Sequence, residues 1–511
     1  MFEILIERKD FFFNLLLEHI QISLIAIVIA IIIGGISGIL ISEYERTAKP
    51  TLAVVGVLYT IPSISMLGFL IPFSGIGNAT AIIALTIYAL LPMVRSTYTG
   101  IKNVDDRIIE AARGMGSTNF QILYKIKLPL AFPVIMSGIR NMVTMTIALS
   151  GIAAFIGAGG LGVAIYRGIT TNNLNMTMAG SLLIAALALL LDFLLGIVER
   201  NLGQTSSVNK KKRQIKKRLS LAFTAVLILA VIFSAINFNK KSVIRIATKP
   251  MTEQYILGNM LAILIEQETD LEVELTEGVG GGTSNIQPAL EKGEFDMYPE
   301  YTGTGWNMAL KNEGIYSEDL FEQLVQGYEQ QYDLTWRGML GFNNTYGMAV
   351  RTEIAEKFNL KTYSDLAKAS DQLIFGANYD FFEREDGFKA VTEAYNMHFK
   401  DTLDMDIGLK YQAINQGKID VLSVFTTDGQ LSQSDVIVLE DDLHFYPSYK
   451  CGTVIRTEVL DKHPELEVVL EKLAGTIDDA QMSKMNDLVE SKNQEPEDVA
   501  EDFLAEIGLL N

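Results

Sequence analysis

Cysteine is almost absent from this chain of 511 residues, which contains a single thiol at Cys451. One cysteine excludes an intramolecular disulfide framework and any metal site built from several thiolates. Histidine is scarce as well, and the four histidines are scattered, so no metal site is expected: His19, His398, His444 and His463. Nothing near the N-terminus resembles a cleavable signal or a lipidation cysteine, so we expect membrane spans to place any extracytoplasmic part.

The sequence also lacks the G-x-x-x-x-G-K-[ST] motif with which many proteins bind ATP phosphates. Residues 157–162, GAGGLG, match the dinucleotide motif G-x-G-x-x-G, but that motif requires a preceding strand and a following helix. Here the glycines lie between two apolar runs, so we expect a bent or re-entrant membrane segment instead. No nucleophile–base pair stands on a recognisable catalytic turn, which disfavours an ectoenzyme. Because the ATP motif is missing, any energy from ATP must come from another polypeptide.

Each half of the sequence is poor in charge of one sign. Residues 1–241 hold 22 Lys and Arg against 11 Asp and Glu, whereas residues 242–511 hold 20 against 50. The first part also contains long apolar runs. This asymmetry indicates two bodies in different surroundings, one in a membrane and one in water.

Six apolar runs of roughly 20 residues are long enough to cross a bilayer. They are expected near 20–42, 51–72, 78–99, 130–150, 178–198 and 219–238. The mixed segment 1–17 is expected to form a helix at the membrane surface. These runs predict an all-α transmembrane domain over 1–203, followed by a basic linker and a final span over 204–241.

The basic residues predict how the chain crosses the membrane, because cytoplasmic loops carry an excess of Lys and Arg. The loop 95–127 and the linker 210–218, KKKRQIKKR, are both basic and are separated by two spans. The segment between those two spans, 151–177, contains a single basic residue, Arg167. We therefore expect an N-terminus outside the cell and an extracytoplasmic domain over 242–511.

The polar segment at 110–129, EAARGMGSTNFQILYKIKLP, carries a spaced motif. Its residues alone predict that a helix begins at 110–112, that Gly116 allows a tight turn and that Pro129 starts the next helix. An ordinary helix–turn–helix loop would account for the same residues.

The spacing of this segment resembles the coupling segment of ABC importer permeases, EAA-x3-G-x9-I-x-LP. The matching positions are Glu110, Ala111, Ala112, Gly116, Ile126, Leu128 and Pro129. The resemblance implies docking on a separate ATPase subunit that binds ATP and Mg²⁺, with no cofactor in this chain. It also implies a homodimer of this chain facing two ATPase copies in a bacterial cytoplasmic membrane.

The acidic part alternates short strands with helices, which is typical of an α/β domain. A strand at 243–248, a helix at 252–268 and a strand at 271–275 open it. Further strands are expected at 294–298, 347–351, 372–376, 419–424, 435–439 and 452–456. About 270 residues suffice for two lobes, with connections near 343–350 and 445–455. Cys451 would be a buried packing residue near the second connection.

Several stretches of this domain resemble the type II solute-binding domains of the glycine betaine/choline class of ABC importers. They are KPMTEQYILG (249–258), GGTSNIQPALEKGEFDMYPEYTGTGW (281–306), GFNNTYGMAV (341–350), DFFEREDG (380–387), TTDG (426–429) and FYPSYKCGTVIR (445–456). The second of these resembles the ergothioneine-importing branch. The resemblance implies an importer subunit, not an enzyme, that fuses a permease to a bilobed binding domain for a trimethylammonium betaine.

The chemistry of such a ligand selects candidate residues. A trimethylammonium group has no hydrogen to donate and is bound by aromatic faces; the candidates in the resembling motifs are Tyr301, Tyr346, Tyr379, Phe381, Phe382 and Tyr446. Donors for the carboxylate would be Gln254, Thr304, Asn344 and Arg384, and polar partners for an imidazole-thione ring would be Glu383, Thr426 and Asp428. Each aromatic residue could instead be ordinary packing, and Arg384 could simply pair with Glu383.

Other interpretations stay open at this point. Glycine betaine, carnitine or choline compete with ergothioneine as the ligand, and no nucleic acid is expected as a partner. A membrane-tethered sensor would need a cytoplasmic output domain, which the sequence does not provide. Asp192, within the fifth apolar run, could be a structural polar contact or part of a translocation path.

Overall fold

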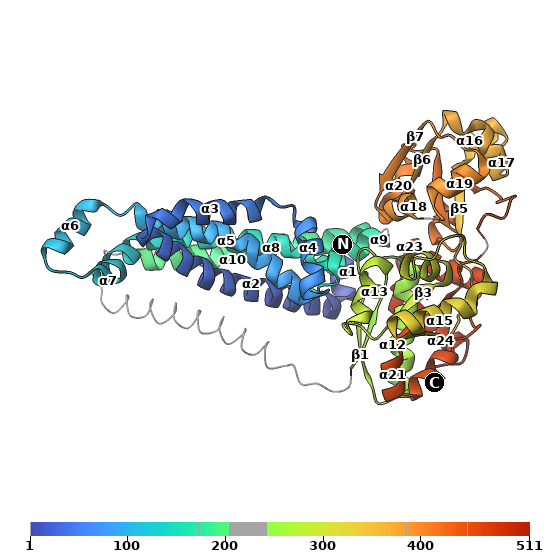
Figure 1. Ribbon diagram of the computed structural model, residues 1–511, viewed down its shortest axis with the longest axis horizontal. Helices are drawn as coiled ribbons and strands as arrows, with labels where there is room; N and C mark the ends of the chain where they lie inside the picture. Colours follow the sequence, from blue (N-terminus) through green and yellow to red (C-terminus); the bar gives the residue numbers. More distant parts are fainter. Residues whose placement is uncertain (1, 172, 204–242, 385, 447, 511) are drawn as a thin grey trace. The chain divides into compact units, whose positions relative to one another are not determined.

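The computed structural model describes all residues except 1, 172, 204–242, 385, 447 and 511. The described residues form two compact units, a helical one over 2–165 and 175–203 and an α/β one over 166–174 and 243–511 (Figure 1). The predicted linker and sixth span, 204–241, lie outside the described residues.

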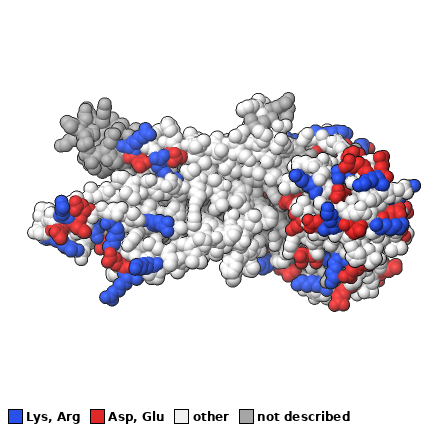
Figure 2. Space-filling model, turned by 90° about the horizontal axis from the view of Figure 1, so that it is seen from above, with Lys and Arg blue, Asp and Glu red and all other residues white. Residues whose placement is uncertain are grey.

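The helical unit is built from long apolar helices joined by short turns. Its helices are α1 (Phe2–Glu7), α2 (Lys9–Glu43), α3 (Glu45–Thr60), α4 (Ser63–Ser74), α5 (Asn78–Lys102), α6 (Asp106–Gly114), α7 (Asn119–Ile122), α8 (Leu128–Ser150), the start of α9 (Gly162–Thr170) and α10 (Leu174–Gly203). Four described spans are long and apolar enough to cross a membrane, or five if the bent pair α3–α4 counts as one. Figure 2 shows a broad belt of this unit without charged side chains, as a lipid-facing surface requires.

Two of the predicted spans have a different form in the structure. Helix α2 runs for 35 residues from Lys9, so residues 9–17 continue into the long helix. The prediction of a separate helix over 1–17 is wrong for these residues. Phe12, Leu15, His19 and Ile22 are buried at helical spacing, which extends the inward face of α2 into that region. The predicted span 51–72 is bent by 100° between α3 and α4, where Pro62 keeps the preceding residue extended.

The GAGGLG segment is a bent connection between helices, as expected. It follows a 3₁₀ turn, Gly151–Ile156, rather than a strand, and α9 begins at its last glycine. Its backbone N–H groups donate to side chains of other helices: Gly159 N to Asn78 Oδ1 at 2.9 Å and Gly160 N to Glu18 Oε2 at 3.0 Å. These hydrogen bonds give partners to backbone N–H groups that lie outside a regular helix.

The α/β unit contains two five-stranded sheets, each covered by helices (Figure 1). The first sheet has the order β2-β1-β3-β10-β4, with β1 (Val243–Ala247), β2 (Glu272–Thr276), β3 (Met297–Tyr301), β4 (Leu334–Arg337) and β10 (Cys451–Arg456). The second has the order β7-β6-β8-β5-β9, with β5 (Tyr346–Arg351), β6 (Ile374–Asn378), β7 (Asp401–Met405), β8 (Val421–Phe425) and β9 (Val436–Val438). The predicted bilobed α/β architecture is therefore confirmed.

The helices of this unit follow the chain through both lobes. They are α12 (Thr252–Glu268), α13 (Thr283–Glu291), α14 (Thr302–Thr304), α15 (Phe321–Tyr332), α16 (Thr352–Phe358), α17 (Tyr363–Ala369), α18 (Tyr379–Glu383), α19 (Phe388–Tyr395), α20 (Lys410–Asn415), α21 (Thr457–Lys462), α22 (Glu465–Glu471), α23 (Asp479–Glu490) and α24 (Pro496–Glu506). Helix α12 is buried along most of its length in the first lobe, with its first turn at the site described below.

The chain crosses between the lobes twice, after β4 and after β9. An isolated bridge between Asn343 and Lys450 joins the two crossings side by side. The crossings occupy 338–345 and 439–450, slightly earlier than 343–350 and 445–455, because β5 begins at Tyr346 and β10 at Cys451. The Cys451 thiol is fully buried, in line with the packing role expected for it.

Candidate ligand-binding site

The Glu253 carboxylate forms a polar centre between the two lobes. It lies in the first turn of α12, is 3% exposed, and accepts hydrogen bonds from four side chains. The donors are the Tyr301 hydroxyl, Asn344 Nδ2 at 2.7 Å, Thr427 Oγ1 at 2.6 Å and Asn486 Nδ2 at 3.4 Å. Burial raises the pKa of the Glu253 carboxyl, and the four donors oppose that shift.

These four donors come from different parts of the chain. Tyr301 ends β3 in the first lobe, and Asn344 lies in the first crossing. Thr427 follows β8 of the second lobe, and Asn486 belongs to α23. One carboxylate thus joins both lobes and a crossing between them.

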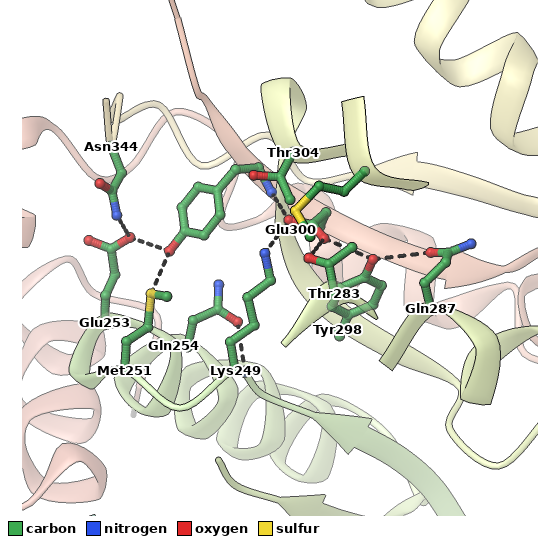
Figure 3. A network of polar contacts seen from close by, with 12 residues as sticks. Lys249, Met251, Glu253, Gln254, Thr283, Gln287, Tyr298, Glu300, Thr304 and Asn344 are labelled. Carbon is green, nitrogen blue, oxygen red and sulfur yellow. Dashed lines mark hydrogen bonds and ion pairs between the residues drawn. The ribbon is translucent and has the colours of Figure 1, made fainter. Parts of the chain in front are cut away.

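A second buried carboxylate, Glu300, belongs to the same polar network (Figure 3) and accepts from the backbone N–H of Tyr301 at 2.6 Å. It pairs with Lys249 and accepts from Thr283 Oγ1 at 2.6 Å and from the Tyr298 hydroxyl at 2.9 Å. The Lys249 ammonium lies 4.8 Å from the centre of the Tyr301 ring. Tyr301 is therefore held between two carboxylate networks, which fix the direction of its ring.

Tyr346, the first residue of β5, is the centre of an aromatic cluster. Its ring centroid lies 5.0 Å from those of Phe381 and Phe425, 5.7 Å from that of Tyr446 and 5.8 Å from that of Tyr449. These side chains come from β5, α18, the end of β8 and the second crossing. The cluster offers several aromatic faces and phenol edges in one place, which is the chemistry that attracts a quaternary ammonium group.

The Arg384 guanidinium is buried against this cluster. Its central carbon lies 5.4 Å from the centre of the Tyr346 ring and 5.7 Å from that of Tyr449. Nε and Nη2 donate to Asp386, each at 2.6 Å, and Nη1 donates to Thr304 Oγ1 at 3.3 Å. Arg384 is thus paired with Asp386 and not with Glu383, which is exposed.

The structure brings most of the predicted site residues together. The carboxylate networks and the aromatic cluster contain Gln254, Tyr301, Thr304, Asn344, Tyr346, Phe381, Arg384 and Tyr446. The Gln254 amide oxygen accepts from the backbone N–H of Lys249 at 3.3 Å. All eight side chains are buried.

Five predicted residues are exposed or contact other residues of the protein. Tyr379 is 60% exposed, and Phe382 packs on Phe375 and Phe388 in the second lobe. Thr426 is exposed and bridges to the first crossing through its hydroxyl, which donates to the backbone oxygen of Asn343 at 3.2 Å. Glu383 is exposed. Asp428 pairs with Lys410 and accepts from the Tyr411 hydroxyl at 2.8 Å.

Several site residues were not predicted from the sequence. They are Lys249, Glu253, Asp386, Phe425, Thr427 and Tyr449. Four of them stand one to three positions from a predicted residue in the same motif, so the motif indicated the neighbourhood. Thr427 rather than Thr426 faces Glu253 because the chain turns just after β8.

A small polar pocket adjoins the aromatic cluster through Phe425. Its walls include Met251, Glu253, Asn344, Lys410, Phe425, Thr427, Asp428, Asn486 and Glu490. Burial and, to a smaller extent, the neighbouring Asp428 carboxylate raise the pKa of the Glu490 carboxyl to about 8. Among the described residues, no group of three or more His, Cys, Asp or Glu side chains could hold a metal ion.

Comparisons with known proteins decide the family. Residues 242–506 match the substrate-binding domain of the ABC-type glycine betaine transport system, and residues 26–208 match the inner membrane component of binding-protein-dependent transport systems. The ergothioneine transport permease/ergothioneine binding protein EgtU of Helicobacter pylori is 41% identical over 94% of this chain and 88% of its own length. The chain belongs to the ABC importers whose permease is fused to its binding domain.

Proteins consisting of only one of the two parts are also similar. The carnitine transport binding protein OpuCC of Listeria monocytogenes is 35% identical over 57% of this chain and 97% of its own length. The carnitine transport permease protein OpuCB of the same species is 42% identical over 36% of this chain and 85% of its own length. In this ABC importer the helical unit is accordingly the membrane permease, and the chain is a transport component rather than an enzyme.

The importer's polar segment at 110–129 forms two short helices and a turn. Helix α6 begins at Asp106, with the Asp105 carboxylate accepting from Arg107 N at 2.9 Å, so the prediction that a helix begins at 110–112 is wrong. Acidic residues cap helices well, and the pair before Arg107 provides that start four residues earlier. Gly116 has φ of +83°, as the predicted tight turn requires, and Pro129 lies in the first turn of α8.

The exposed side chains of this segment are notably apolar. Phe120 and Tyr124 are exposed and stacked, with ring centroids 6.4 Å apart, and Met115 is exposed at the turn. Glu110 is exposed, whereas Ala112 is buried. An apolar, exposed turn of this kind is typical of a surface that binds another protein.

Asp192 of the permease makes a structural ion pair. Arg140 of α8 donates to it through Nε at 3.0 Å and Nη2 at 2.8 Å, and through Nη1 to Glu199 at 2.7 Å. The pair joins α8 to α10, so a charge in an apolar helix has its partner. This geometry favours the structural interpretation of Asp192.

Proposed function

We propose that this chain imports a trimethylammonium betaine, ergothioneine, by capturing it outside the cell and passing it through its own permease. The Tyr346-centred aromatic cluster carries this proposal. A trimethylammonium group cannot donate a hydrogen bond and is held by aromatic faces, each contributing roughly 0.5–2 kcal/mol. The identity of the ligand rests on the 41% identical ergothioneine transporter.

The remaining donors suit the carboxylate of a betaine. Arg384 and Thr304 lie beside the aromatic cluster, and Gln254 lies at the start of α12. Arg384 donates to Asp386 through Nε and Nη2, and through Nη1 to Thr304 and to the Met308 sulfur at 3.2 Å, so one of its five N–H groups remains for a ligand. A zwitterion with adjacent charges would thus meet aromatic rings and donors in one place.

Glycine betaine, carnitine or choline is the second candidate class of ligand. The carnitine transport binding protein OpuCC is 35% identical to this chain over the binding domain. The same aromatic cluster would hold these ligands, because all of them carry the trimethylammonium group.

The transport assembly that we propose contains two copies of this chain and two copies of an ATPase subunit, which binds ATP and Mg²⁺. The exposed segment at 110–129, with Glu110 and Gly116 at its motif positions, would dock on the ATPase. A groove lined by Arg95, Ser137 and Asn141 would form part of the translocation path. The chain would lie in a bacterial cytoplasmic membrane, with its N-terminus and binding domain outside.

Calorimetry on the purified full-length chain in lipid nanodiscs tests the proposal. Ergothioneine, glycine betaine, carnitine and choline would each be titrated, and ergothioneine should bind most tightly. Absence of heat with all four would refute the substrate class, whereas tighter glycine betaine binding would refute only the ergothioneine assignment. ATP-dependent uptake in vesicles with the partner ATPase distinguishes transport from a membrane-tethered sensor, which would bind without uptake.

A further inference from the structure

Four polar side chains are exposed on two helices that are long and apolar enough to cross a membrane. Arg95 and Thr99 lie one turn apart on α5, and Ser137 and Asn141 lie one turn apart on α8. We call these four residues the polar stripe. Charged and polar side chains at membrane depth face a cavity, water or protein rather than lipid. The polar stripe therefore marks a part of the helical unit that is not covered by lipid.

The polar stripe lines one groove of the helical unit, with a volume of about 700 Å³. Tyr59 at the end of α3 and the apolar side chains of Leu91 and Val134 form other parts of its wall. Its floor is tight, because a Cβ atom on Gly138 of α8 would lie 1.9 Å from the Ser96 hydroxyl of α5. Small-molecule sites in proteins typically have volumes of about 300–1,000 Å³, so the groove has room for a betaine.

The groove extends far into the span. Arg95 lies seven residues before Lys102, where α5 ends, and Asn141 lies 13 residues after Leu128, where α8 begins. At about 1.5 Å per residue these separations are roughly 10 Å and 20 Å, in a hydrocarbon core of roughly 30 Å. Both helix ends border the basic loop that we expect in the cytoplasm. The groove thus runs from near the cytoplasmic side to beyond the middle of the membrane.

The Arg95 side chain makes no ion pair or hydrogen bond with any residue that the structure describes. Arg140, which precedes Asn141 on α8, is different: it donates to Asp192 and to Glu199. A cation within a span normally has a partner or faces water. A guanidinium binds a carboxylate well, so an anionic group that enters the groove finds its counter-charge at Arg95.

The Tyr59 ring provides a second kind of contact in the same groove. It packs edge-on against Tyr88, with ring centroids 6.2 Å apart, and its hydroxyl donates to Met145 Sδ at 3.2 Å. These contacts hold the ring in place, and the residue is still 37% exposed. Since aromatic faces attract quaternary ammonium groups, the groove offers one partner for each charge of a betaine.

We propose that this groove is a second betaine site, inside the permease, in which Arg95 binds the carboxylate and the Tyr59 ring contacts the trimethylammonium group. The inference rests on the proposed function, because it gives the ligand a place on its way from the binding domain to the cytoplasm. A zwitterion loses favourable hydration when it leaves water, and these two partners offset that loss. Contact between two copies of the chain is the competing explanation for the polar stripe.

The first test asks whether water and a cation reach the polar stripe in the full-length chain in lipid nanodiscs. The chain has a single cysteine, Cys451, which is fully buried, so an introduced thiol can be labelled selectively. Ser137→Cys should react with a methanethiosulfonate reagent that carries a trimethylammonium group. Leu189→Cys, at an exposed apolar position of α10, should not react, because lipid excludes the charged reagent. No reaction at either position would show that the polar stripe is covered and would overturn the site.

The second test measures ATP-dependent uptake of ergothioneine in vesicles that contain the partner ATPase. Arg95→Gln should lower the maximal rate about tenfold or more, whereas the affinity of the full-length chain in calorimetry should change less than about twofold. Arg95→Lys keeps the charge and should retain more of the rate than Arg95→Gln. Arg46→Gln is the matched control, because Arg46 is exposed on α3 and does not line the groove.

The aromatic contact is tested in the same vesicles. Tyr59→Leu should also lower the maximal rate about tenfold, because it removes the aromatic face. Tyr59→Phe should keep most of the rate, since it retains the ring and loses only the hydrogen bond to Met145. Equal losses in both variants would show that Tyr59 acts through its hydroxyl and would overturn its assigned role.

The remaining outcomes separate the site from its alternatives. Normal uptake by both Arg95→Gln and Tyr59→Leu would overturn the site and leave the proposed function intact. A smaller fraction of dimer in Arg95→Gln, measured by native mass spectrometry, would assign the polar stripe to contact between two copies. Absence of uptake by the unmodified chain would refute the proposed function itself. If a variant fails to fold, the labelling of Ser137→Cys still decides whether the groove is open.

Discussion

Replacing Asp386 by asparagine would test how far the ligand site depends on the counter-ion of its buried arginine. Asp386 accepts from Nε and Nη2 of Arg384, both at 2.6 Å, and from the Tyr449 hydroxyl. Both charged side chains are almost completely buried. An amide at position 386 keeps the shape of the side chain, but it removes the charge and one of the two acceptor oxygens.

The magnitude follows from these contacts. Removing one member of a buried, hydrogen-bonded ion pair typically costs about 3–5 kcal/mol, because the other charge stays buried. The amide oxygen introduced at position 386 would still accept one hydrogen bond from the guanidinium, so the lower end of that range applies. We therefore expect Asp386→Asn to lower the free energy of unfolding of the binding domain by about 3 kcal/mol.

Urea unfolding of the binding domain, expressed as residues 242–511, would measure this change. A similar binding protein consists of that part alone, so the domain should fold as a separate chain. The control is Asp365→Asn, which breaks the exposed pair with Lys368 and should leave the unfolding midpoint unchanged. Replacing both Arg384 and Asp386 by apolar residues should recover most of the stability. If Asp386→Asn unfolds at the same urea concentration as the control, the reasoning fails.

Three further predictions concern pH, the ligand and the docking segment. The pKa of Glu490 is raised from 4.5 to about 8, so between these pH values the folded domain retains a proton that the unfolded chain releases. The free energy of unfolding should therefore fall as the pH rises from about 4.5 to 8. Glu490→Gln should flatten that fall in urea titrations at different pH values. Tyr346→Leu should weaken ergothioneine binding about tenfold in calorimetry, whereas Tyr379→Leu, at an exposed ring, should not. Gly116→Ala strains a turn with φ of +83° and should reduce uptake without changing ligand binding, unlike Gly114→Ala in the adjacent helix. Equal effects within either pair of variants would contradict the corresponding prediction.

The elements that follow a regular apolar pattern could be predicted from the sequence. Helix α5 and helix α10 each contain a single apolar stretch, and strand β5 is buried along almost all of its length. Strand β7, Asp401–Met405, was missed because its first four side chains are exposed and two of its five residues are Asp. At the edge of a sheet the backbone ladder defines the strand, and the side chains carry no pattern.

The residues of the site divide in the same way. Tyr346 and Arg384 stand in motifs whose composition already indicates side chains that bind a cation and a carboxylate. Glu253 carries no such signal, because its significance lies in partners 48, 91, 174 and 233 positions away. A sequence shows that a carboxylate is present, but only the fold shows how many donors converge on it.

The convergence on Glu253 also has an energetic meaning. A buried carboxylate is expensive to remove from water, and an apolar residue would fill the same volume more cheaply. Its four donors can all reach it in only one arrangement of β3, the first crossing, the turn after β8 and α23. Two of those donors, Asn344 and Asn486, also direct their free oxygens to the pocket. The carboxylate that fixes the arrangement of the lobes therefore also sets the orientation of both amides.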